Sequence, residues 1–389
     1  MSRLGQAVVR EGKALIHVDG IEDAYAGGRL EPAWMPVFYN PAMIPNRDIS
    51  VAALQAYIDV YAPHRPVNIV EPLTATGVRS VRYALELEGT GRVIAGDIDP
   101  RAVELARVNA EANGVNVEVV EGDARCILYS LRDTPVLVAD IDPFGSPAPF
   151  IDAALKALGR GGLLAVTATD LAVLEGSKAR AALRRYMARL ERIPHSKEVA
   201  VRALIGYIAR VAASMDKAVE PLLSYYQGHY VRLYLRVERG AKRADRMLEE
   251  QLGYLYHCPE DGTAWLGEPG CSNPRSLGPL WIGSLWDPRF VDMTLRQVEA
   301  RTYLQSRREA IKLLSIIRGE AGLGTVVHQR IDSIASSMRI SMPKRVAVLD
   351  ELSKMGYRAV ETHFSPVGVR SDADPGLVAG VVRRLSEGS

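Results

Sequence analysis

The chain has 389 residues, of which 48% are apolar and 24% charged, and its net charge is +2. This composition is typical of a folded globular protein of two to three domains and excludes an intrinsically disordered chain. We find no apolar run of about 18 residues and no signal-peptide core at the N-terminus, so neither a membrane span nor a leader is expected. Three cysteines are too few for a disulfide framework, which fits a reducing cytoplasm.

The first half of the chain alternates between strand and helix patterns. Residues 1–46 carry only short strand and turn candidates, and Asp48–Tyr61 has helical spacing, with Asp48 or Ser50 placed to cap its start. Further helices are expected at Gly77–Leu87 and Pro100–Asn113. Strands are expected at Val67–Leu73, Arg92–Asp97, Val115–Gly122, Val136–Ile141 and Gly162–Thr169. This alternation predicts an α/β fold with a doubly wound, mostly parallel sheet.

The second half is less regular. The segment Cys258–Trp286 is rich in Gly, Pro and Trp and cannot form one regular element. Helices are predicted at Leu183–Ala213, Thr294–Ile317 and Gln329–Met338, and a strand at Tyr230–Val237. We place a domain boundary near residue 240, with residues 1–240 forming the α/β domain and residues 241–389 a smaller α+β domain.

Acidic residues follow the predicted parallel strands, at the sheet edge where doubly wound folds bind ligands. Glu71 and Asp97 end the first two strands, and Asp97 can accept both hydrogens of a ribose diol. After the third strand, the Asp123 carboxylate and the Ala124 backbone N–H can bind an adenine edge. Each acid alone could be an ordinary helix cap. Their occurrence in order favours a nucleotide-like cofactor.

The first strand–helix turn, PLTATG, keeps only one glycine, Gly77. The dinucleotide-binding pattern GxGxxG is therefore absent, which argues against nicotinamide and flavin enzymes. A nucleoside cofactor without a pyrophosphate fits better, and S-adenosylmethionine is one.

The hexapeptide Asp140–Gly145 follows the fourth strand and carries the predicted chemistry. The Asp142 carboxylate can accept hydrogen bonds from an aromatic amino group, whose nitrogen is a weak nucleophile until its lone pair leaves the ring. Phe144 offers a face on which an extruded base can stack. Pro143 stiffens the loop and keeps these groups in place. Asp140 either pairs internally or orients the loop; the alternative for the whole segment is an ordinary turn.

Two segments are strongly basic. Residues 176–210 hold nine Lys/Arg and two acids, and residues 301–345 hold nine Lys/Arg and three acids. The rest of the chain therefore carries a charge of about −11, from +2 less +7 and +6. This distribution fits either a surface that meets a polyanion or two solvated helical faces.

The motifs FYNPAMIPNRDISV (38–51), EPLTATGVRSVRYA (71–84), DIDPFGSPAPFID (140–152) and THFSPVGVRSDADP (362–375) resemble those of the archaeal-type tRNA (guanine-26, N2)-dimethyltransferases. The resemblance covers nearly the whole chain. It implies a class I S-adenosylmethionine-dependent methyltransferase that acts on tRNA in the cytoplasm, with a C-terminal domain that contacts tRNA. No obligate protein partner and no membrane contact are inferred.

Carried over to this sequence, the resemblance implies cofactor contacts by Arg47, Arg79, Asp97, Asp123 and Ala124. A guanidinium at Arg47 can grip the methionyl carboxylate in a bidentate manner. The target guanine would be held by Asp142 and Phe144.

One motif departs from the family. Many relatives carry CxxC…CxxC in the C-terminal domain, but the corresponding segments here begin at Cys258 and Cys271 and supply only two cysteines. His257 or Asp261 could substitute for a missing cysteine, but because a structural zinc ion needs four ligands, we expect no metal in this chain.

Two other functions remain open at this point. An amino-methyltransferase acting on adenine N6 of RNA or DNA would need the same DPFG segment. A tRNA-binding protein with a vestigial methyltransferase site would keep the basic segments but not need Asp142.

Overall fold

The computed structural model describes residues 7–22, 24–26, 29–62, 66–134 and 136–387. They form two compact units. Unit 1 comprises Met1–Thr167, Tyr234–Glu238 and Asp292–Lys312, and unit 2 comprises Ala168–Leu233, Arg239–Val291 and Leu313–Ser389. Because each unit takes segments from distant parts of the chain, the units do not coincide with a division at residue 240. The division at residue 240 stays a prediction that separates a methyltransferase domain from a tRNA-contacting domain.

The main sheet has seven strands in the order β10-β11-β9-β8-β5-β6-β7. The five strands from β9 to β7 pair in parallel. Chain order reverses between β5 and β8, and in a doubly wound sheet that switch point lies beside the ligand site. The bounds of the strands are β5 Val67–Glu71, β6 Thr90–Asp97, β7 Val117–Glu121, β8 Val136–Ile141, β9 Leu158–Ala168, β10 Lys217–Gln227 and β11 Tyr230–Arg239. The predicted fold class is confirmed.

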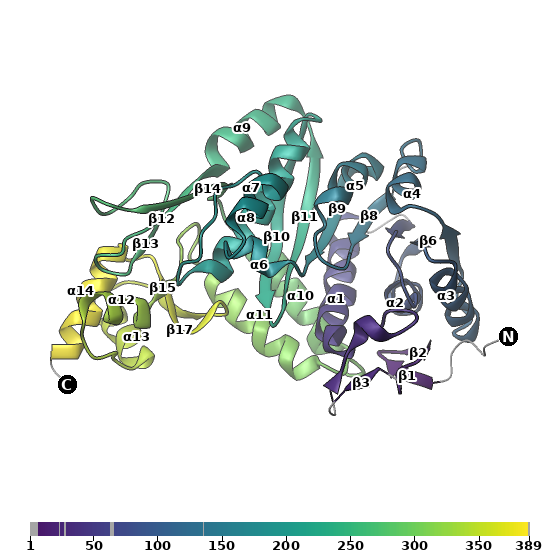
Figure 1. Ribbon diagram of the computed structural model, residues 1–389, viewed down its shortest axis with the longest axis horizontal. Helices are drawn as coiled ribbons and strands as arrows, with labels where there is room; N and C mark the ends of the chain where they lie inside the picture. The colour runs from purple at the N-terminus through teal and green to yellow at the C-terminus, as the bar shows by residue number, and fades with distance from the viewer. Residues whose placement is uncertain (1–6, 23, 27–28, 63–65, 135, 388–389) are drawn as a thin grey trace. The chain divides into compact units, whose positions relative to one another are not determined.

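Five helices of unit 1 accompany this sheet: α1 Ile44–Tyr61, α2 Val78–Glu86, α3 Pro100–Ala112, α4 Ala124–Ser130 and α5 Ile151–Ala157. Helix α2 packs on α1 and α3, while α4 packs on α5, and the two groups lie on opposite sides of the strands (Figure 1). The Asp99 carboxylate caps α3 by accepting a hydrogen bond from the N–H of Arg101 at 2.9 Å.

The start of α1 was predicted wrongly. The helix begins at Ile44, so Asp48 and Ser50 lie inside it and cap nothing. The cap belongs to Asn40, which accepts from Ala42 N at 2.9 Å in the 3-10 turn that leads into α1. Pro45 in the first helical turn is the sequence feature that marks this earlier start.

Short antiparallel strands precede α1. Strands β1 (Ala7–Glu11) and β2 (Ala14–Val18) pair, as do β3 (Tyr25–Ala26) and β4 (Arg29–Leu30). Ala14, Ile16 and Val18 of β2 are buried and share a core with Val78 and Val81 of α2. This contact ties the N-terminal hairpin to the helix that follows the first strand of the sheet.

Two long predicted helices prove to be interrupted. The segment Leu183–Ala213 contains the end of α7 (Ala179–Tyr186) and α8 (Ser196–Ala213), because α7 stops where Met187 adopts a left-handed backbone with φ 52°. The predicted helix Thr294–Ile317 is likewise two helices, α10 (Pro288–Ala300) and α11 (Arg307–Ala321). Besides α7 and α8, unit 2 contains α6 Leu171–Leu174, α9 Ala241–Gln251, and a sheet of β12 Leu252–His257, β13 Ala264–Leu266 and β14 Arg275–Trp281.

The three cysteines were expected to form no disulfide framework, and the one disulfide that the structure contains was not predicted. Cys258 and Cys271 form a disulfide across 13 residues, with their Cα atoms 6.0 Å apart, and Cys126 is free and exposed. The turn between β12 and β14 brings the two sulfurs together, which spacing alone did not reveal. Within the described residues, no three His, Cys, Asp or Glu side chains are grouped to hold a metal ion.

The C-terminal part of unit 2 is a small α/β substructure. The predicted segment Gln329–Met338 is the short strand β15 (Gln329–Arg330) followed by α12 (Ile331–Met338). It continues with α13 Arg345–Lys354, β16 Ala359–Thr362, β17 Ser365–Ser371 and α14 Pro375–Glu387, and the sheet order is β15-β17-β16. In the described part of the chain, no helix is long and apolar enough to span a bilayer.

Candidate active site

Asp142 stands one residue beyond β8, at the carboxyl edge of the parallel sheet, with its side chain 19% exposed. Arg79 of α2 is buried, forms an ion pair with Asp142, and donates to Asn46 Oδ1 at 2.9 Å. Burial lowers the pKa of Arg79, but Asp140 and Asp142 outweigh burial and hold it well above its usual value. Arg79 therefore stays a cation, and it orients a carboxylate that solvent can reach.

A second, fully buried layer lies behind this pair. The Tyr83 hydroxyl donates to Asp140 Oδ2 at 2.5 Å, and Arg79 Nη1 lies 3.6 Å from the same oxygen. Arg79 Nη1 also donates to Ser50 Oγ at 3.0 Å, which in turn hydrogen-bonds the Tyr234 hydroxyl at 2.9 Å. Asp140 thus pairs internally, which confirms one of the two roles expected for it.

Two aromatic rings stand beside Asp142. Phe144 is 83% exposed, and Phe38 is 38% exposed. Their ring centroids lie 6.0 Å apart in an edge-to-face arrangement at 75°. Pro143 is buried and Gly145 has φ 88°, so the turn fixes its backbone while Phe144 projects outward. An exposed ring of this kind is suited to stacking on a planar ligand.

Glu71 holds the β5–α2 turn closed from inside. Its Oε2 accepts hydrogen bonds from Thr74 Oγ1 at 2.9 Å, from Ser80 N at 3.0 Å, and from the Ser80 hydroxyl. Burial raises the pKa of Glu71 to about 8, although Arg79 opposes the shift. The side chain predicted to bind cofactor is thus occupied by the turn itself.

The same turn approaches α3 so closely that it needs glycine. Gly77 has φ 76°, and a Cβ atom there would lie 2.9 Å from Ala106 Cβ. Two buried polar atoms of this region, Thr76 Oγ1 and Asn46 Nδ2, have no hydrogen-bond partner among the described residues. Because buried polar atoms are nearly always paired, these two suit the polar groups of a bound molecule.

Asp97 ends β6 and is held by two backbone donors. Its Oδ2 accepts from Ala75 N at 2.9 Å and its Oδ1 from Asp99 N at 3.0 Å. The next residue, Ile98, is 69% exposed at the sheet edge. A fixed carboxylate beside an exposed apolar side chain suits a nucleoside, whose ribose is polar and whose base has an apolar face.

Asp123 ends the loop after β7 and caps α4. It accepts from Arg125 N at 2.8 Å and pairs with the Arg125 guanidinium at 2.8 Å. Hydrogen bonds from Arg125 lower the pKa of Asp123 to about 2, so it is ionised at neutral pH. Ala124, which follows it, is buried, and its residue position is the first of the helix.

Arg47 is bound internally. Its Nε and Nη2 donate to the two carboxylate oxygens of Glu11 at 2.6 and 2.7 Å, and Nη2 also donates to Asn40 O at 3.1 Å. The Tyr39 hydroxyl donates to Glu11 Oε2 at 3.0 Å. Any cofactor carboxylate would compete with Glu11 for this guanidinium.

The motifs singled out from the sequence contain three side chains of the site that were not assigned a role: Phe38, Asn46 and Tyr83. Phe38 and Asn46 lie in the same FYNP…NRD segment as Arg47. Tyr83 lies one helical turn after Arg79 on α2, and that spacing was the available signal for a shared partner.

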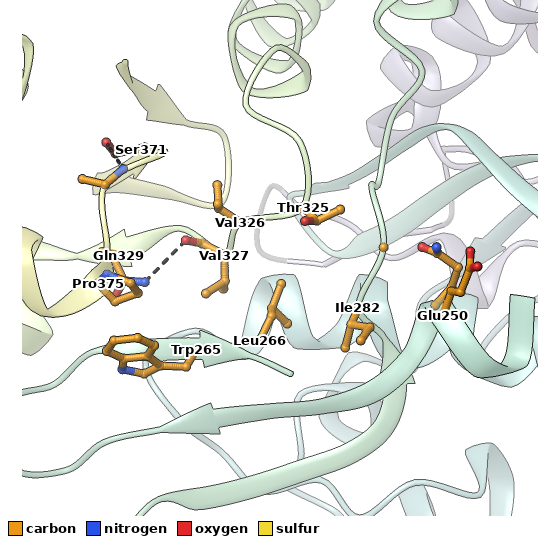
Figure 2. Close-up of a pocket in the computed structure, with 13 residues that line it drawn as sticks. Glu250, Trp265, Leu266, Ile282, Thr325, Val326, Val327, Gln329, Ser371 and Pro375 are labelled. Carbon is orange, nitrogen blue, oxygen red and sulfur yellow. Dashed lines mark hydrogen bonds between the residues drawn. The ribbon is translucent and has the colours of Figure 1, made fainter. Parts of the chain in front are cut away.

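A separate cavity of about 360 Å³ lies in unit 2 (Figure 2). Trp265 and Leu266 of β13 line it together with Val327 and Gln329. The Gln329 amide exchanges hydrogen bonds with the backbone of Ala264, at 2.9 and 2.7 Å, so its polar atoms are already used. None of the residues predicted to bind cofactor or substrate lines this cavity.

Known proteins resemble this chain along its whole length. The family model described as N2,N2-dimethylguanosine tRNA methyltransferase matches residues 12–383. The tRNA (guanine(26)-N(2))-dimethyltransferase of Aeropyrum pernix is 47% identical over 97% of each chain. The enzyme of the same name from Saccharolobus solfataricus is 38% identical over 97% of this chain and 98% of its own.

A solved structure agrees with these matches. The complex of Trm1 from Pyrococcus horikoshii with S-adenosyl-L-methionine is 33% identical, covers 97% of this chain and 99% of its own, and superposes with a TM-score of 0.85. The chain therefore belongs to the N2,N2-dimethylguanosine tRNA methyltransferase family, as its motifs predicted.

Proposed function

We propose that this chain transfers one or two methyl groups from S-adenosylmethionine to the exocyclic N2 of guanine 26 in tRNA, in the cytoplasm. Family membership supports the reaction and substrate. The observation that carries the assignment of the site is the position of Asp142, a partly exposed carboxylate between buried Arg79 and exposed Phe144.

Asp142 is the residue that activates the amino group. Its carboxylate accepts a hydrogen bond from N2, which draws the nitrogen lone pair out of the guanine ring. It is also the group that can accept the proton that N2 loses when the new N–C bond forms. Arg79 fixes the direction of the Asp142 carboxylate, because the guanidinium is buried and also donates to Asn46.

Phe144 and Phe38 bind the extruded base. The open face of Phe144 stacks on guanine, and Phe38, at a steep angle to it, limits how far the base can slide. Pro143 holds the loop that carries Phe144. Removing a base from its stack costs about a few kcal/mol, which contact with two rings helps to offset.

S-adenosylmethionine supplies an electrophilic methyl group when bound. We assign its binding to Arg47, Glu71, Arg79, Asp97, Asp123 and Ala124. We assign Asp97 to the ribose diol, and Asp123 with the Ala124 N–H to the adenine edge. The unpaired Thr76 Oγ1 and Asn46 Nδ2 support a polar ligand beside the β5–α2 turn. Glu71 acts by holding that turn, since its Oε2 already accepts three hydrogen bonds.

Helix α7 is our candidate for the first tRNA contact. Arg180 and Arg184 on the helix and Arg189 and Arg192 after it are exposed, and so are Leu183 and Met187 between them. Exposed cations in one short segment suit a phosphate backbone.

The test is mass spectrometry of nucleosides from unmodified tRNA transcripts incubated with the protein and S-adenosylmethionine. Transcripts carry guanine or adenine at position 26. We expect N2-methylguanosine and N2,N2-dimethylguanosine only with guanine. Formation of methyladenosine would support a methyltransferase but contradict guanine as its substrate. Absence of methylation with both transcripts, from protein that binds tRNA, would favour a vestigial site.

A further inference from the structure

The last 60 residues of the chain contain a helix–turn–helix followed by a β-hairpin. Helices α12 and α13 are joined by residues 339–344, and strands β16 and β17 follow directly. Strand β15, which precedes α12, pairs with β17, so the sheet order is β15-β17-β16. This order of helices and strands is that of a winged helix, in which the hairpin is the wing and the second helix contacts nucleic acid.

The substructure has its own core and a defined outer surface. Ile334 of α12 and Val348 and Leu352 of α13 pack with Val369 of β17 and Val382 of α14. With these side chains turned inward, Arg339, Met342 and Lys344 of the turn and Val346 of α13 are exposed to solvent.

Arg345 fastens the start of α13 to the wing. Its Nη1 donates to Pro366 O at 2.8 Å, and its Nη2 pairs with Glu361 at 2.7 Å. The turn before α13 is therefore held against both strands of the hairpin. A surface fixed in this way is suited to bind a partner without first being ordered.

The pattern of paired and unpaired cations singles out the turn. Every other Lys or Arg from Gln329 to Glu387 lies within 4 Å of a carboxylate oxygen, as the pairs Arg330–Asp332, Arg345–Glu361, Lys354–Glu351, Arg358–Asp372, Arg370–Glu198, Arg383–Glu387 and Arg384–Glu351 show. Arg339 and Lys344 alone in this stretch are exposed and have no ion-pair partner among the described residues. They mark the two ends of the same turn.

Two large apolar side chains accompany these cations. Met342 is 52% exposed and Val346 is 64% exposed. Arg339 moreover has φ 57°, a backbone conformation that costs an arginine more than a glycine. Cations at both ends of an exposed turn, with Met342 between them and Val346 just beyond, complement phosphates flanking a ribose.

We propose that residues 339–346, at the N-terminal end of α13, form a second tRNA contact that binds the phosphate backbone of a double-stranded stem. The major groove of an A-form stem is too deep and narrow to admit a helix, so the contact is with phosphates and ribose rather than with base edges. Such a contact increases the affinity for tRNA and fixes its orientation on the protein, but it does not depend on the tRNA sequence. This inference rests on the proposed function, since it assumes that tRNA is the substrate.

The experiment compares the double variant Arg339→Ala/Lys344→Ala with the full-length wild type. The matched control is Arg383→Ala/Arg384→Ala, which removes two exposed cations of the same substructure that are already paired with Glu387 and Glu351. Binding of unmodified tRNA is measured by filter retention over a series of salt concentrations. Equal thermal midpoints for the three proteins establish that the substitutions leave the fold intact.

We expect the slope of log affinity against log salt to fall by about 0.9 for each phosphate that the variant no longer binds, hence by nearly two in the double variant. The control keeps the wild-type slope. In methylation assays the double variant has a raised KM for full-length tRNA and an unchanged kcat, because the turn does not touch the reacting base.

A wild-type salt slope and KM in the double variant would overturn the proposal and leave the turn to a protein partner or to no partner. Failure of the wild type to methylate any tRNA would instead reject the proposed function, and the salt slopes would still report whether the turn contacts RNA.

Discussion

Each unit contains a cluster of buried charged side chains. The cluster of unit 1 includes a carboxylate that is partly exposed to solvent, whereas the Arg370 cluster of unit 2 is fully buried. In unit 1, Arg79 connects buried Asp140 with Asp142, whose side chain is 19% exposed beside the open ring of Phe144. In unit 2, Arg370 lies 2.8 Å from Glu198 and 3.0 Å from Glu320, and all three are fully buried. The first cluster positions the carboxylate that we propose to be reactive, whereas the second joins secondary-structure elements.

The enclosed cluster of unit 2 connects α8, α11 and the C-terminal sheet. Glu198 of α8 also pairs with Arg202 at 2.7 Å and with His328 at 2.6 Å, while Glu320 of α11 binds His363. Because desolvation of buried charges is unfavourable, an intact buried ion pair contributes little net stability. Removing one member is nevertheless strongly destabilising, because it leaves the other charge buried and uncompensated. This difference between the units predicts which substitutions affect stability and which affect chemistry.

The largest expected loss of stability follows from Arg370→Met. It leaves Glu198 and Glu320 buried without their shared cation, which we expect to cost about 3–5 kcal/mol in the free energy of unfolding. Urea denaturation measures this loss. The control Arg383→Met breaks an exposed pair with Glu387 and should cost less than about 1 kcal/mol. Equal losses in the two variants would contradict the distinction.

Acid should weaken both units, and Glu11 in unit 1 and Glu320 in unit 2 are two of the carboxyl groups through which it acts. Burial raises the pKa of Glu11, but Arg47 and Arg82 outweigh burial and bring it to about 2; for Glu320, His363 and Arg370 have the same effect. A depressed carboxyl pKa stabilises the fold above the ordinary value of 4.5, and this stability is lost as pH falls toward 2. Each group contributes about 3 kcal/mol.

The variant Glu11→Gln checks this assignment. It lowers stability at neutral pH, and because it no longer titrates, its unfolding midpoint should fall less than that of the wild type between pH 5 and pH 3. An identical fall in both proteins would mean that Glu11 is not among the groups that take up protons.

The disulfide gives unit 2 a constraint for which unit 1 has no counterpart in the described residues. Replacing Cys258 and Cys271 by serine should cost about 3 kcal/mol, since the bond closes a loop of 13 residues. A thiol reagent under denaturing conditions should find one cysteine, Cys126, before reduction and three afterwards. Cys126→Ser, as the control, should leave stability unchanged. Three thiols before reduction would disprove the bond.

The smallest effect concerns α7. Arg184 is exposed and has no ion-pair partner among the described residues, whereas Arg185 lies 2.6 Å from Asp170. If α7 contacts tRNA, Arg184→Ala reduces the salt slope of binding by about 0.9. Arg185→Ala reduces it less, because its charge is already compensated. An unchanged slope for Arg184→Ala would remove α7 from the interface.

Local patterns in the sequence were enough to predict the parallel sheet. Alternating strand and helix signals placed β5 to β9 within a few residues, because each segment has its own periodicity and turn residues. Strand β10 was not predicted. Helices α7 and α8 were predicted as one helix, because Met187 ends α7 in a left-handed backbone that its residue type does not favour. The Cys258–Cys271 bond depends on a chain reversal between β12 and β14, which no local pattern shows.

The positions of the candidate site residues in the fold were predictable, but their contacts were not. Acids at strand ends and the DPFG turn led us to propose Asp97, Asp123, Asp142 and Phe144, and the structure places each of them at or just after the end of a parallel strand. The sequence did not show that Arg79 pairs with Asp142, since the two are 63 residues apart and meet only when α2 packs on the sheet. The bond between Arg47 and Glu11 likewise joins α1 to an N-terminal hairpin whose strands carry little pattern.

The most direct test of the account is Asp142→Asn, which keeps the size of the side chain and removes its charge. We expect methylation of tRNA, measured by nucleoside mass spectrometry, to fall about 10²–10³-fold. Binding of S-adenosylmethionine by calorimetry and the thermal midpoint should stay at wild-type values. Near wild-type methylation by Asp142→Asn would contradict the central claim that this carboxylate activates the guanine amino group.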